Sequence, residues 1–320
     1  MRTVAIEYPG PRQVELVAIG PPPDPGPGQV LLCTVHSGIT NGTERHSLLG
    51  EHGWATAFPG RNGYQQVGVV EAVGSNVRGF APGDWVFYGQ YVGHRGWNVV
   101  DVSQADGSHL VLRLPDGLDR RHAVLLGVAG VAMRNVRRIR VGTGSNVWVA
   151  GLGPIGQFAA QCARAAGARV TVSDTNERRL AVARELGAHV AVNPGGEVVS
   201  QEIAAGGPYT HMIDCCGAPS LLHDAARAGL VPHGGVISLL AVRSDTSFPW
   251  SMLHGTEASI EVSCHFTLDD LRALVMLIGL GTIGVGPMIS HVVPIDEAPA
   301  IYGTLAETPG ELLGVVFDWE

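Results

Sequence analysis

Apolar and polar residues alternate in two different ways along this chain, and the change falls near residue 118. Before it, short apolar segments are separated by turns rich in glycine and proline, such as PPPDPGPG at 21–28 and APGD at 81–84. This spacing is typical of the short strands of a small barrel. We therefore predict an all-β first region, whose strands include 3–8, 29–36 and 68–73.

After residue 118, apolar runs of strand length alternate with segments of helical spacing. Continuous apolar runs are typical of strands buried on both faces of a parallel sheet. The sequence predicts strands at 147–150, 169–173, 189–192, 212–214 and 235–240, and helices at 118–140, 155–166, 177–186 and 221–228. This alternation predicts an α/β domain with a doubly wound parallel sheet. Beyond Cys264 we expect a helix at 268–278, a strand at 289–293, a helix at 294–305 and a last strand at 312–317.

The segment 146–174 carries a dinucleotide-binding fingerprint. An apolar strand runs directly into GLGPIG, a helical pattern follows, and a second apolar strand ends on Asp174, about twenty residues beyond the glycines. Gly151 permits the tight turn, Gly153 lets a pyrophosphate approach the backbone, and Gly156 lets the helix pack close to the strand. Asp174 would accept the ribose hydroxyls and repel a 2′-phosphate, which favours NAD over NADP. Arg178 and Arg179 leave NADP open, because either arginine could grip that phosphate.

Further residues near the strand ends are expected to contact the cofactor, since ligands bind at the carboxyl ends of strands in open α/β sheets. The turn after 212–214 and the turn after 235–240 are two such places. The predicted cofactor-binding residues are Gly151, Gly153, Pro154, Ile155, Gly156, Asp174, Thr175, Arg179, Cys215 and Leu239.

Composition narrows the possible partners. The 320 residues are 45% hydrophobic and 16% charged, with a formal net charge of −8. This is the balance of a globular chain, and it argues against nucleic acid or an anionic membrane as a partner. The N-terminus lacks an apolar segment of signal-peptide type, so we expect a soluble cytoplasmic protein. The five cysteines form no C-x-x-C pair, and reduced, mostly buried thiols are expected.

Both regions together resemble the medium-chain dehydrogenase/reductase superfamily, which includes the zinc alcohol dehydrogenases. The resemblance is carried by VGVVEAVGSNVRGFAPGDWV (67–86), LRLPDGLD (112–119), GLGPIG (151–156), NERRLAVARELGAHVAVNP (176–194), IDCCGAP (213–219) and ISHVVPIDEA (289–298). It implies a GroES-like β-barrel domain at 1–120, a Rossmann NAD-binding domain at 121–265, and a return to the catalytic domain at 266–320. It also implies a small alcohol or carbonyl substrate and a homodimer or homotetramer.

The zinc ligands of that superfamily are missing at the corresponding positions. Zinc-dependent members use a G-[IV]-C-x-[ST]-D segment, a G-H-E segment and a later cysteine or acid. Here these positions hold Thr40 or Asn41, Tyr64 followed by Gln65, and Val128. A hydroxyl or amide, a phenol and a valine cannot replace a thiolate–imidazole–thiolate set, so we expect no catalytic zinc. The four clustered cysteines of the structural zinc lobe are also absent.

Other residues do not rebuild a metal site by any recognisable spacing. The candidates considered are His36, Glu44, His46, His52 and His94. SGITNGTE at 37–44 and the FPG and GY elements at 58–64 instead resemble a zinc-lacking branch that includes bacteriochlorophyllide dehydrogenase. That resemblance implies the zinc-free architecture and not the pigment substrate.

Without a metal, hydrogen-bond donors and a proton relay must handle the substrate oxygen. The resemblance places Thr43, or alternatively Thr40, at the relay hydroxyl. Glu44 is a candidate general base; the alternative is a structural carboxylate paired with Arg45 or Arg61.

Two more side chains are catalytic candidates. Tyr64 could donate to a carbonyl oxygen, or it could be a barrel-core aromatic. His46 could pass protons to solvent, or it could be an exposed loop histidine. Aromatic residues expected in loops of the first region suggest a bulky or ring-containing substrate in an apolar cleft. They are Trp54, Phe58, Tyr88, Tyr91 and Trp97.

These features favour a zinc-independent oxidoreductase that transfers a hydride between NAD(H) and a secondary alcohol or ketone. An NADPH-dependent ene- or quinone-type reductase is the enzymatic alternative. A catalytically inactive nucleotide-sensing or scaffold protein is the alternative of another class.

Overall fold

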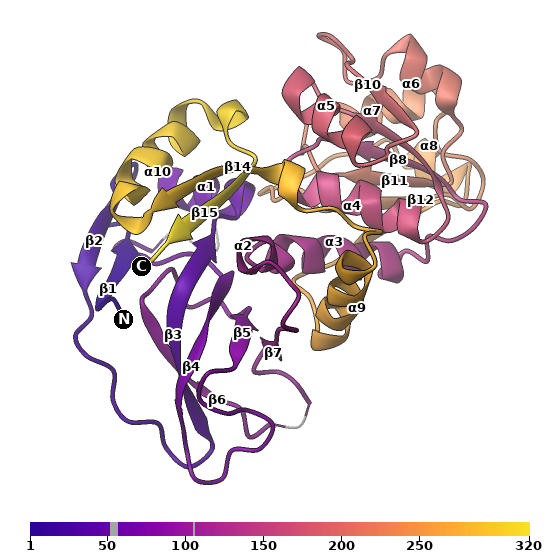
Figure 1. The fold of residues 1–320 in the computed structure, drawn as a ribbon. Coiled ribbons are helices and arrows are strands. Elements are labelled where there is room, and N and C mark those ends of the chain that lie inside the picture. Colours follow the sequence, from indigo (N-terminus) through magenta and orange to yellow (C-terminus); the bar gives the residue numbers. More distant parts are fainter. Residues whose placement is uncertain (52–56, 105) are drawn as a thin grey trace. The chain divides into compact units, whose positions relative to one another are not determined.

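The chain forms two compact units in the computed structural model, which describes residues 1–51, 57–104 and 106–320. The first unit comprises Met1–Val128, Thr267–Gly279 and Ile289–Glu320, and the second comprises Ala129–Phe266 and Leu280–Met288 (Figure 1). The predicted architecture, a β domain followed by an α/β domain with a parallel sheet, is confirmed. The sequence-based boundaries at residues 120 and 265 stay predictions.

The first unit is built on a mixed sheet with strand order β14-β15-β3-β4-β5-β7, in which β6 also pairs with β3. Its strands are β3 (Gln29–Gly38), β4 (Gln66–Val73), β5 (Trp85–Tyr88), β6 (Trp97–Asp101), β7 (Val111–Arg113), β14 (Ile289–Pro294) and β15 (Gly314–Asp318). A separate hairpin joins β1 (Val4–Glu7) to β2 (Glu15–Ala18). β15 lies antiparallel to β3, with Phe317 opposite Ser37, so the end of the chain completes the sheet that its beginning starts.

Helices of the first unit are α1 (Asn41–Leu49), α2 (Arg120–Ala123), α9 (Leu268–Gly279) and α10 (Ala298–Glu307). Short 3-10 turns lie at Ile295–Glu297 and Pro309–Glu311. The prediction that residues before 118 are all-β is wrong at α1. That helix opens with Asn41, Gly42 and Thr43, which are poor helix formers, and it buries Glu44 and Ser47 beside Leu48. Its buried stripe is therefore partly polar, and no apolar period marks it in the sequence.

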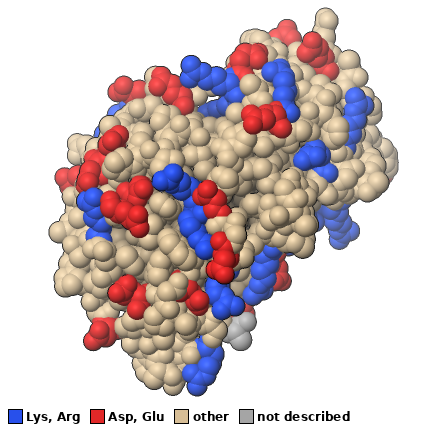
Figure 2. All heavy atoms as spheres, in the orientation of Figure 1, with Lys and Arg blue, Asp and Glu red and all other residues tan. Residues whose placement is uncertain are grey.

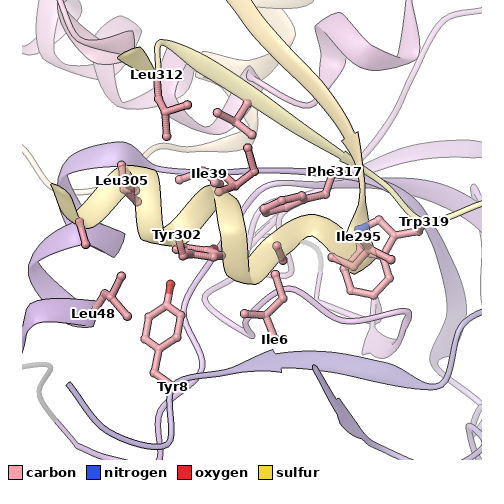
Figure 3. Packing of buried hydrophobic residues seen from close by; sticks show 14 residues of the cluster. Ile6, Tyr8, Ile39, Leu48, Ile295, Tyr302, Leu305, Leu312, Phe317 and Trp319 are labelled. Carbon is pink, nitrogen blue, oxygen red and sulfur yellow. The ribbon is translucent and has the colours of Figure 1, made fainter. Parts of the chain in front are cut away.

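A hydrophobic core ties the end of the chain to its beginning (Figure 3). α10 lies at its centre, and side chains from the first fifty residues and from the last thirty pack around that helix. The labelled members are Ile6, Tyr8, Ile39, Leu48, Ile295, Tyr302, Leu305, Leu312, Phe317 and Trp319. The hydroxyl of Tyr8 points toward Tyr302, which is fully buried.

The second unit holds a fully parallel sheet in the order β10-β9-β8-β11-β12-β13. Its strands are β8 (Asn146–Ala150), β9 (Arg169–Ser173), β10 (Val190–Val192), β11 (His211–Asp214), β12 (Val236–Leu239) and β13 (Ser259–Val262). Its helices are α3 (Leu126–Arg138, which begins in the first unit), α4 (Pro154–Ala165), α5 (Glu177–Glu185), α6 (Gln201–Gly206), α7 (Leu221–Arg227) and α8 (Trp250–His254). A 3-10 turn lies at Gly286–Met288. The strand order reverses between β8 and β11, and ligands bind outside the carboxyl ends of strands at such a switch point.

Basic and acidic side chains are interspersed on the face that Figure 2 shows, without a broad area of one sign. No helix within the described residues has the length and apolar character needed to cross a lipid bilayer.

Candidate functional site

The glycine turn between β8 and α4 is shaped for close contacts. Gly151 has a φ of +92°, and a Cβ there would lie 2.8 Å from the backbone nitrogen of Cys216. A Cβ on Gly156 would lie 1.9 Å from the Gly151 carbonyl oxygen, so only glycine fits. Gly153 has open space around the same position, and it caps α4, with Pro154 as the first helical residue. The fold itself therefore requires glycine at 151 and 156, whereas 153 leaves room above the helix N-terminus.

Asp174 follows β9 and turns back toward this loop. Its Oδ2 accepts the Leu152 N–H at 2.7 Å, and its Oδ1 accepts the Asn176 N–H at 2.8 Å. Arg179 lies 3.8 Å from Oδ2 and Thr175 is exposed. The carboxylate thus holds together the two loops that the fingerprint would use for the pyrophosphate and the ribose.

Sequence reasoning missed the role of Asp214 at the end of β11. This fully buried carboxylate accepts the N–H groups of Cys216 at 3.1 Å and Gly217 at 2.8 Å, and it pairs with Arg243 at 2.6 Å. A carboxylate that ends an apolar strand just before a glycine turn was the available signal. Asp214 and Arg243 thereby fix the turns after β11 and β12, and the predicted contact Leu239 is the last residue of β12.

The cysteines differ from the expectation of mostly buried thiols. Cys162 is buried, Cys33 and Cys215 are partly buried, and Cys216 and Cys264 are exposed. The exposed two follow strand ends, where the chain leaves the sheet. Burial, together with the Asp214 charge, raises the pKa of Cys215 well above its ordinary value and that of Cys216 to about 11. Both side chains are therefore protonated thiols at neutral pH.

In the first unit, the relay candidates lie on or beside α1. Thr40 is its buried N-cap, Thr43 is half-buried in its first turn, and Glu44 is buried. His46 lies on this helix and not in a loop, and its Nδ1 is 2.8 Å from the Glu51 carboxylate.

Glu44 has partners that the sequence did not indicate. Its Oε1 accepts the Thr40 N–H at 2.6 Å, and its Oε2 lies 3.0 Å from His94 Nε2 and accepts the Tyr302 hydroxyl. The alternative of an arginine partner is wrong. Arg45 donates to the Leu305 and Ala306 carbonyls, and Arg61 pairs with Glu7.

The residues at the lost zinc positions make packing contacts and hydrogen bonds within the first unit. Gln65 is fully buried; its Oε1 accepts the Val128 N–H at 2.8 Å, and its Nε2 donates to the Gly38 and Ile39 carbonyls at 3.3 Å. Tyr64 is buried, with its ring centroid 4.6 Å from that of Tyr91. Gln65 thus cross-links three segments of the first unit through backbone groups.

This donor set does not fit zinc, because a hydroxyl, a phenol and an amide already used in backbone hydrogen bonds are poor ligands for it. The Asn41 amide likewise donates to the Leu312 carbonyl at 3.3 Å. Within residues 1–51, 57–104 and 106–320, no three His, Cys, Asp or Glu side chains are grouped as metal ligands. His36 and His94 are buried. His52 lies outside the described residues.

The aromatic residues do not form the set of loop side chains expected from the sequence. Tyr88 ends β5 and packs in the sheet core, and Trp97 begins β6 and donates to the Gly20 carbonyl at 3.0 Å. Both strands are short and bounded by turns, so the sequence pattern did not identify them as strands. Phe58 packs against the α10 core, and Tyr91 is exposed. Trp54 lies outside the described residues.

Comparison with known proteins agrees with this architecture. Residues 26–118 match the family model "Alcohol dehydrogenase GroES-like domain", and residues 154–279 match "Zinc-binding dehydrogenase". An L-threonine 3-dehydrogenase of Deinococcus deserti is 30% identical over 93% of this chain and 94% of its own. The 2-desacetyl-2-hydroxyethyl bacteriochlorophyllide A dehydrogenase of Cereibacter sphaeroides is 27% identical over 100% and 99%.

Solved structures share the whole fold. A structure described as a short chain alcohol dehydrogenase of Escherichia coli CFT073, complexed with NADH, aligns with a TM-score of 0.86 at 21% identity and covers 99% of both chains. A Sinorhizobium meliloti 1021 protein bound to NADP aligns with a TM-score of 0.81 at 24% identity, again over 99% of both. At such identities the likeness concerns the fold alone.

Proposed function

The chain belongs to the zinc-type alcohol dehydrogenase-like branch of the medium-chain dehydrogenase/reductase superfamily, and from this premise we propose a zinc-independent oxidoreductase that uses NAD(H). Its relatives are alcohol and polyol dehydrogenases, so the chain is an oxidoreductase enzyme of that kind. The observation that carries the finer proposal is the replacement of every zinc ligand beside an intact dinucleotide fingerprint with its acid, Asp174.

NAD is the cofactor that the fingerprint favours. The open space at Gly153 and the N-terminus of the twelve-residue helix α4 suit a pyrophosphate, and Asp174 suits two ribose hydroxyls. A 2′-phosphate would bring a dianion against that carboxylate, whereas Arg179 at 3.8 Å would offset part of the repulsion. Gly151, Pro154, Ile155, Gly156, Thr175, Cys215 and Leu239 complete the proposed contacts.

The NAD preference is tested by the ratio of affinities. We expect the wild-type protein to bind NADH more tightly than NADPH by about tenfold or more, since the repulsion acts on one cofactor only. Asp174→Asn keeps a side-chain oxygen that can accept the N–H of Leu152 or of Asn176, but it removes the negative charge. We expect this variant to bring the affinities for NADH and NADPH closer together. Tighter binding of NADPH by the wild type would favour the ene- or quinone-reductase alternative instead.

Zinc independence is supported by the use of Gln65 as a cross-link and by the burial of Tyr64. Protein purified from zinc-supplemented medium should contain far less than one zinc per chain by mass spectrometry. Turnover should survive treatment with a chelator, because no step proposed here needs a Lewis acid. Stoichiometric zinc that leaves together with activity would overturn this part of the proposal.

A secondary alcohol or ketone is the proposed substrate class. The reactions named for L-threonine 3-dehydrogenase and for the hydroxyethyl bacteriochlorophyllide enzyme both occur at secondary alcohols. A bound nicotinamide supplies the hydride chemistry. The chain must then move the hydroxyl proton, and we assign this task to Thr43 or Thr40, with Tyr64 and His46 as further candidates.

The relay assignment is tested with a panel of linear and cyclic secondary alcohols. Thr43→Val and Thr40→Val remove one hydroxyl each at nearly constant volume. The variant at the working relay position should lose roughly a hundredfold or more in kcat, the range of general acid–base contributions, with a small change in NADH affinity. Wild-type turnover in the double variant would reject both threonines.

We further propose that the protein is cytoplasmic and forms a homodimer or homotetramer. Light scattering on purified protein measures the oligomeric state.

A further inference from the structure

A buried polar cluster lies inside the apolar core of the first unit. Glu44 is 1% exposed, and His94, Ser37 and Tyr302 are 0% exposed. The four side chains come from α1, the loop before β6, β3 and α10, so residues far apart in sequence converge on one carboxylate. Charged groups are rarely this buried unless they are fully hydrogen-bonded.

The hydrogen bonds of this cluster run in one direction. Trp319 Nε1, which can only donate, lies 2.9 Å from Ser37 Oγ, so the Ser37 hydroxyl is free to donate to His94 Nδ1 at 2.8 Å. With Nδ1 accepting from Ser37, the Nε2 of His94 carries a proton and donates it to Glu44 Oε2 at 3.0 Å. This arrangement satisfies every group and makes Glu44 an acceptor only.

Tyr302 is the second donor to Glu44 Oε2. Burial, and then the Glu44 charge, raise the pKa of Tyr302 well above its ordinary value, so its hydroxyl keeps its proton. The remaining oxygen, Oε1, accepts the Thr40 N–H at 2.6 Å. With donors on both oxygens, Glu44 is poorly placed to serve as a mobile general base.

Gly63 makes room for this arrangement. Its φ is +118°, and a Cβ there would lie 2.5 Å from both Cδ2 and Nε2 of His94. The residue before Tyr64 must therefore be glycine for the His94 ring to reach Glu44. Gly63 thus joins the Tyr64–Gln65 segment to the buried cluster.

We propose that His94 and Tyr302 are positioning residues, which fix the Glu44 carboxylate and through it the N-cap of α1. Thr40 is held from two sides: its N–H by Glu44, and its hydroxyl by Gln65, whose Nε2 is 3.5 Å away. Thr43 follows in the same turn. This inference rests on the proposed function, because the residues so positioned are the proposed relay hydroxyls.

Two substitutions remove one donor each. Tyr302→Phe deletes a single oxygen, and His94→Leu deletes the imidazole donor at similar bulk. We expect kcat to fall roughly ten- to hundredfold in each, as for small misplacements of reacting groups, while the Kd for NADH stays within about twofold. His94→Gln, which offers an amide N–H toward Glu44, should recover most of the loss.

Tyr209→Phe is the matched control, since it deletes a buried hydroxyl that donates to the Ile203 carbonyl in the second unit. It should keep wild-type kcat. If His94→Leu does not fold, Tyr302→Phe carries the test alone. Equal kcat values for Tyr302→Phe and Tyr209→Phe would overturn the proposal.

Amide hydrogen exchange separates positioning from catalysis. The Thr40 amide should exchange faster in Tyr302→Phe and His94→Leu than in the wild type, and unchanged exchange in both would overturn the positioning role whatever the activity. If Thr40→Val and Thr43→Val keep full turnover while the exchange result holds, the proposed relay fails and the positioning of the N-cap stands.

Discussion

Gly153 and Gly156 occupy the same short turn but differ in the space around them. Gly156 has no room for a Cβ, because the Gly151 carbonyl lies 1.9 Å from where it would be. Gly153 has φ −61° and ψ 178°, which alanine adopts readily, and open space beside it. The constraint at 156 is therefore internal to the fold, whereas the fold places no such constraint on 153, where the proposed pyrophosphate would be the reason for glycine.

The two alanine variants should consequently fail in different ways. Gly153→Ala should keep the wild-type melting temperature but weaken NADH binding by about tenfold, because its methyl group occupies the approach to the backbone. Gly156→Ala should lower the melting temperature. Gly142→Ala, at another position without close neighbours, should change neither quantity. Unaltered NADH affinity in Gly153→Ala would argue against a pyrophosphate at this turn.

Side chains whose role follows from local spacing could be predicted, whereas contacts between residues far apart in sequence could not. Asp174 could be located because strand, glycine turn and acid follow a fixed spacing. Gln65 could be identified as a lost ligand, yet its cross-link to Val128 and Gly38 joins residues far apart in sequence. The Glu44–His94 pair spans fifty residues, and no local pattern distinguishes it from a pair with the neighbouring Arg45.

At the level of elements, the parallel strands β8, β9 and β11 could be predicted because burial on both faces makes them continuously apolar. α1 could not be predicted, since its stability comes from tertiary contacts. Gly50, with φ +75°, caps its C-terminus, and its N-cap Thr40 is held by the Glu44 side chain. The register between β15 and β3 could not be predicted from local patterns either. Paired residues such as Phe317 and Ser37 are 280 positions apart in sequence, and the assembled sheet and core determine which residues pair.

β15 should therefore be critical to the first unit. Phe317 is fully buried, and its ring centroid lies 5.8 Å from that of His94 and 6.0 Å from that of Tyr302. Phe317→Ala should lower the free energy of unfolding by about 3–5 kcal/mol, as for other buried aromatic deletions. Val292→Ala on the adjacent strand β14, where the side chain is 41% exposed, should cost less than about 0.5 kcal/mol. Urea unfolding compares the two, and equal losses would contradict the assigned core.

For the whole molecule, a buried histidine in the first unit and a half-buried one in the second couple stability to pH. In the first unit, burial lowers the pKa of His36 from 6.5, Arg121 lowers it further, and Asp318, 3.9 Å away, opposes the change. In the second, burial lowers the pKa of His211, against a hydrogen bond to the Ile139 carbonyl at 3.0 Å. In both cases the folded protein binds a proton less readily than the unfolded chain.

The sign of the pH effect follows from that difference. Between the lowered pKa and 6.5 the unfolded chain holds more protons, so the free energy of unfolding rises with pH in this window and levels off above 6.5. Below the folded-state pKa of each histidine, both the folded and the unfolded chain are protonated, and the free energy of unfolding no longer changes through that residue. We expect urea unfolding at pH 5.5 to show lower stability than at pH 7.5, and His36→Gln and His211→Gln each to reduce the difference. Since the two residues lie in separate units, the double variant should show the sum of both reductions. An unchanged pH dependence in the double variant would show that other groups control it.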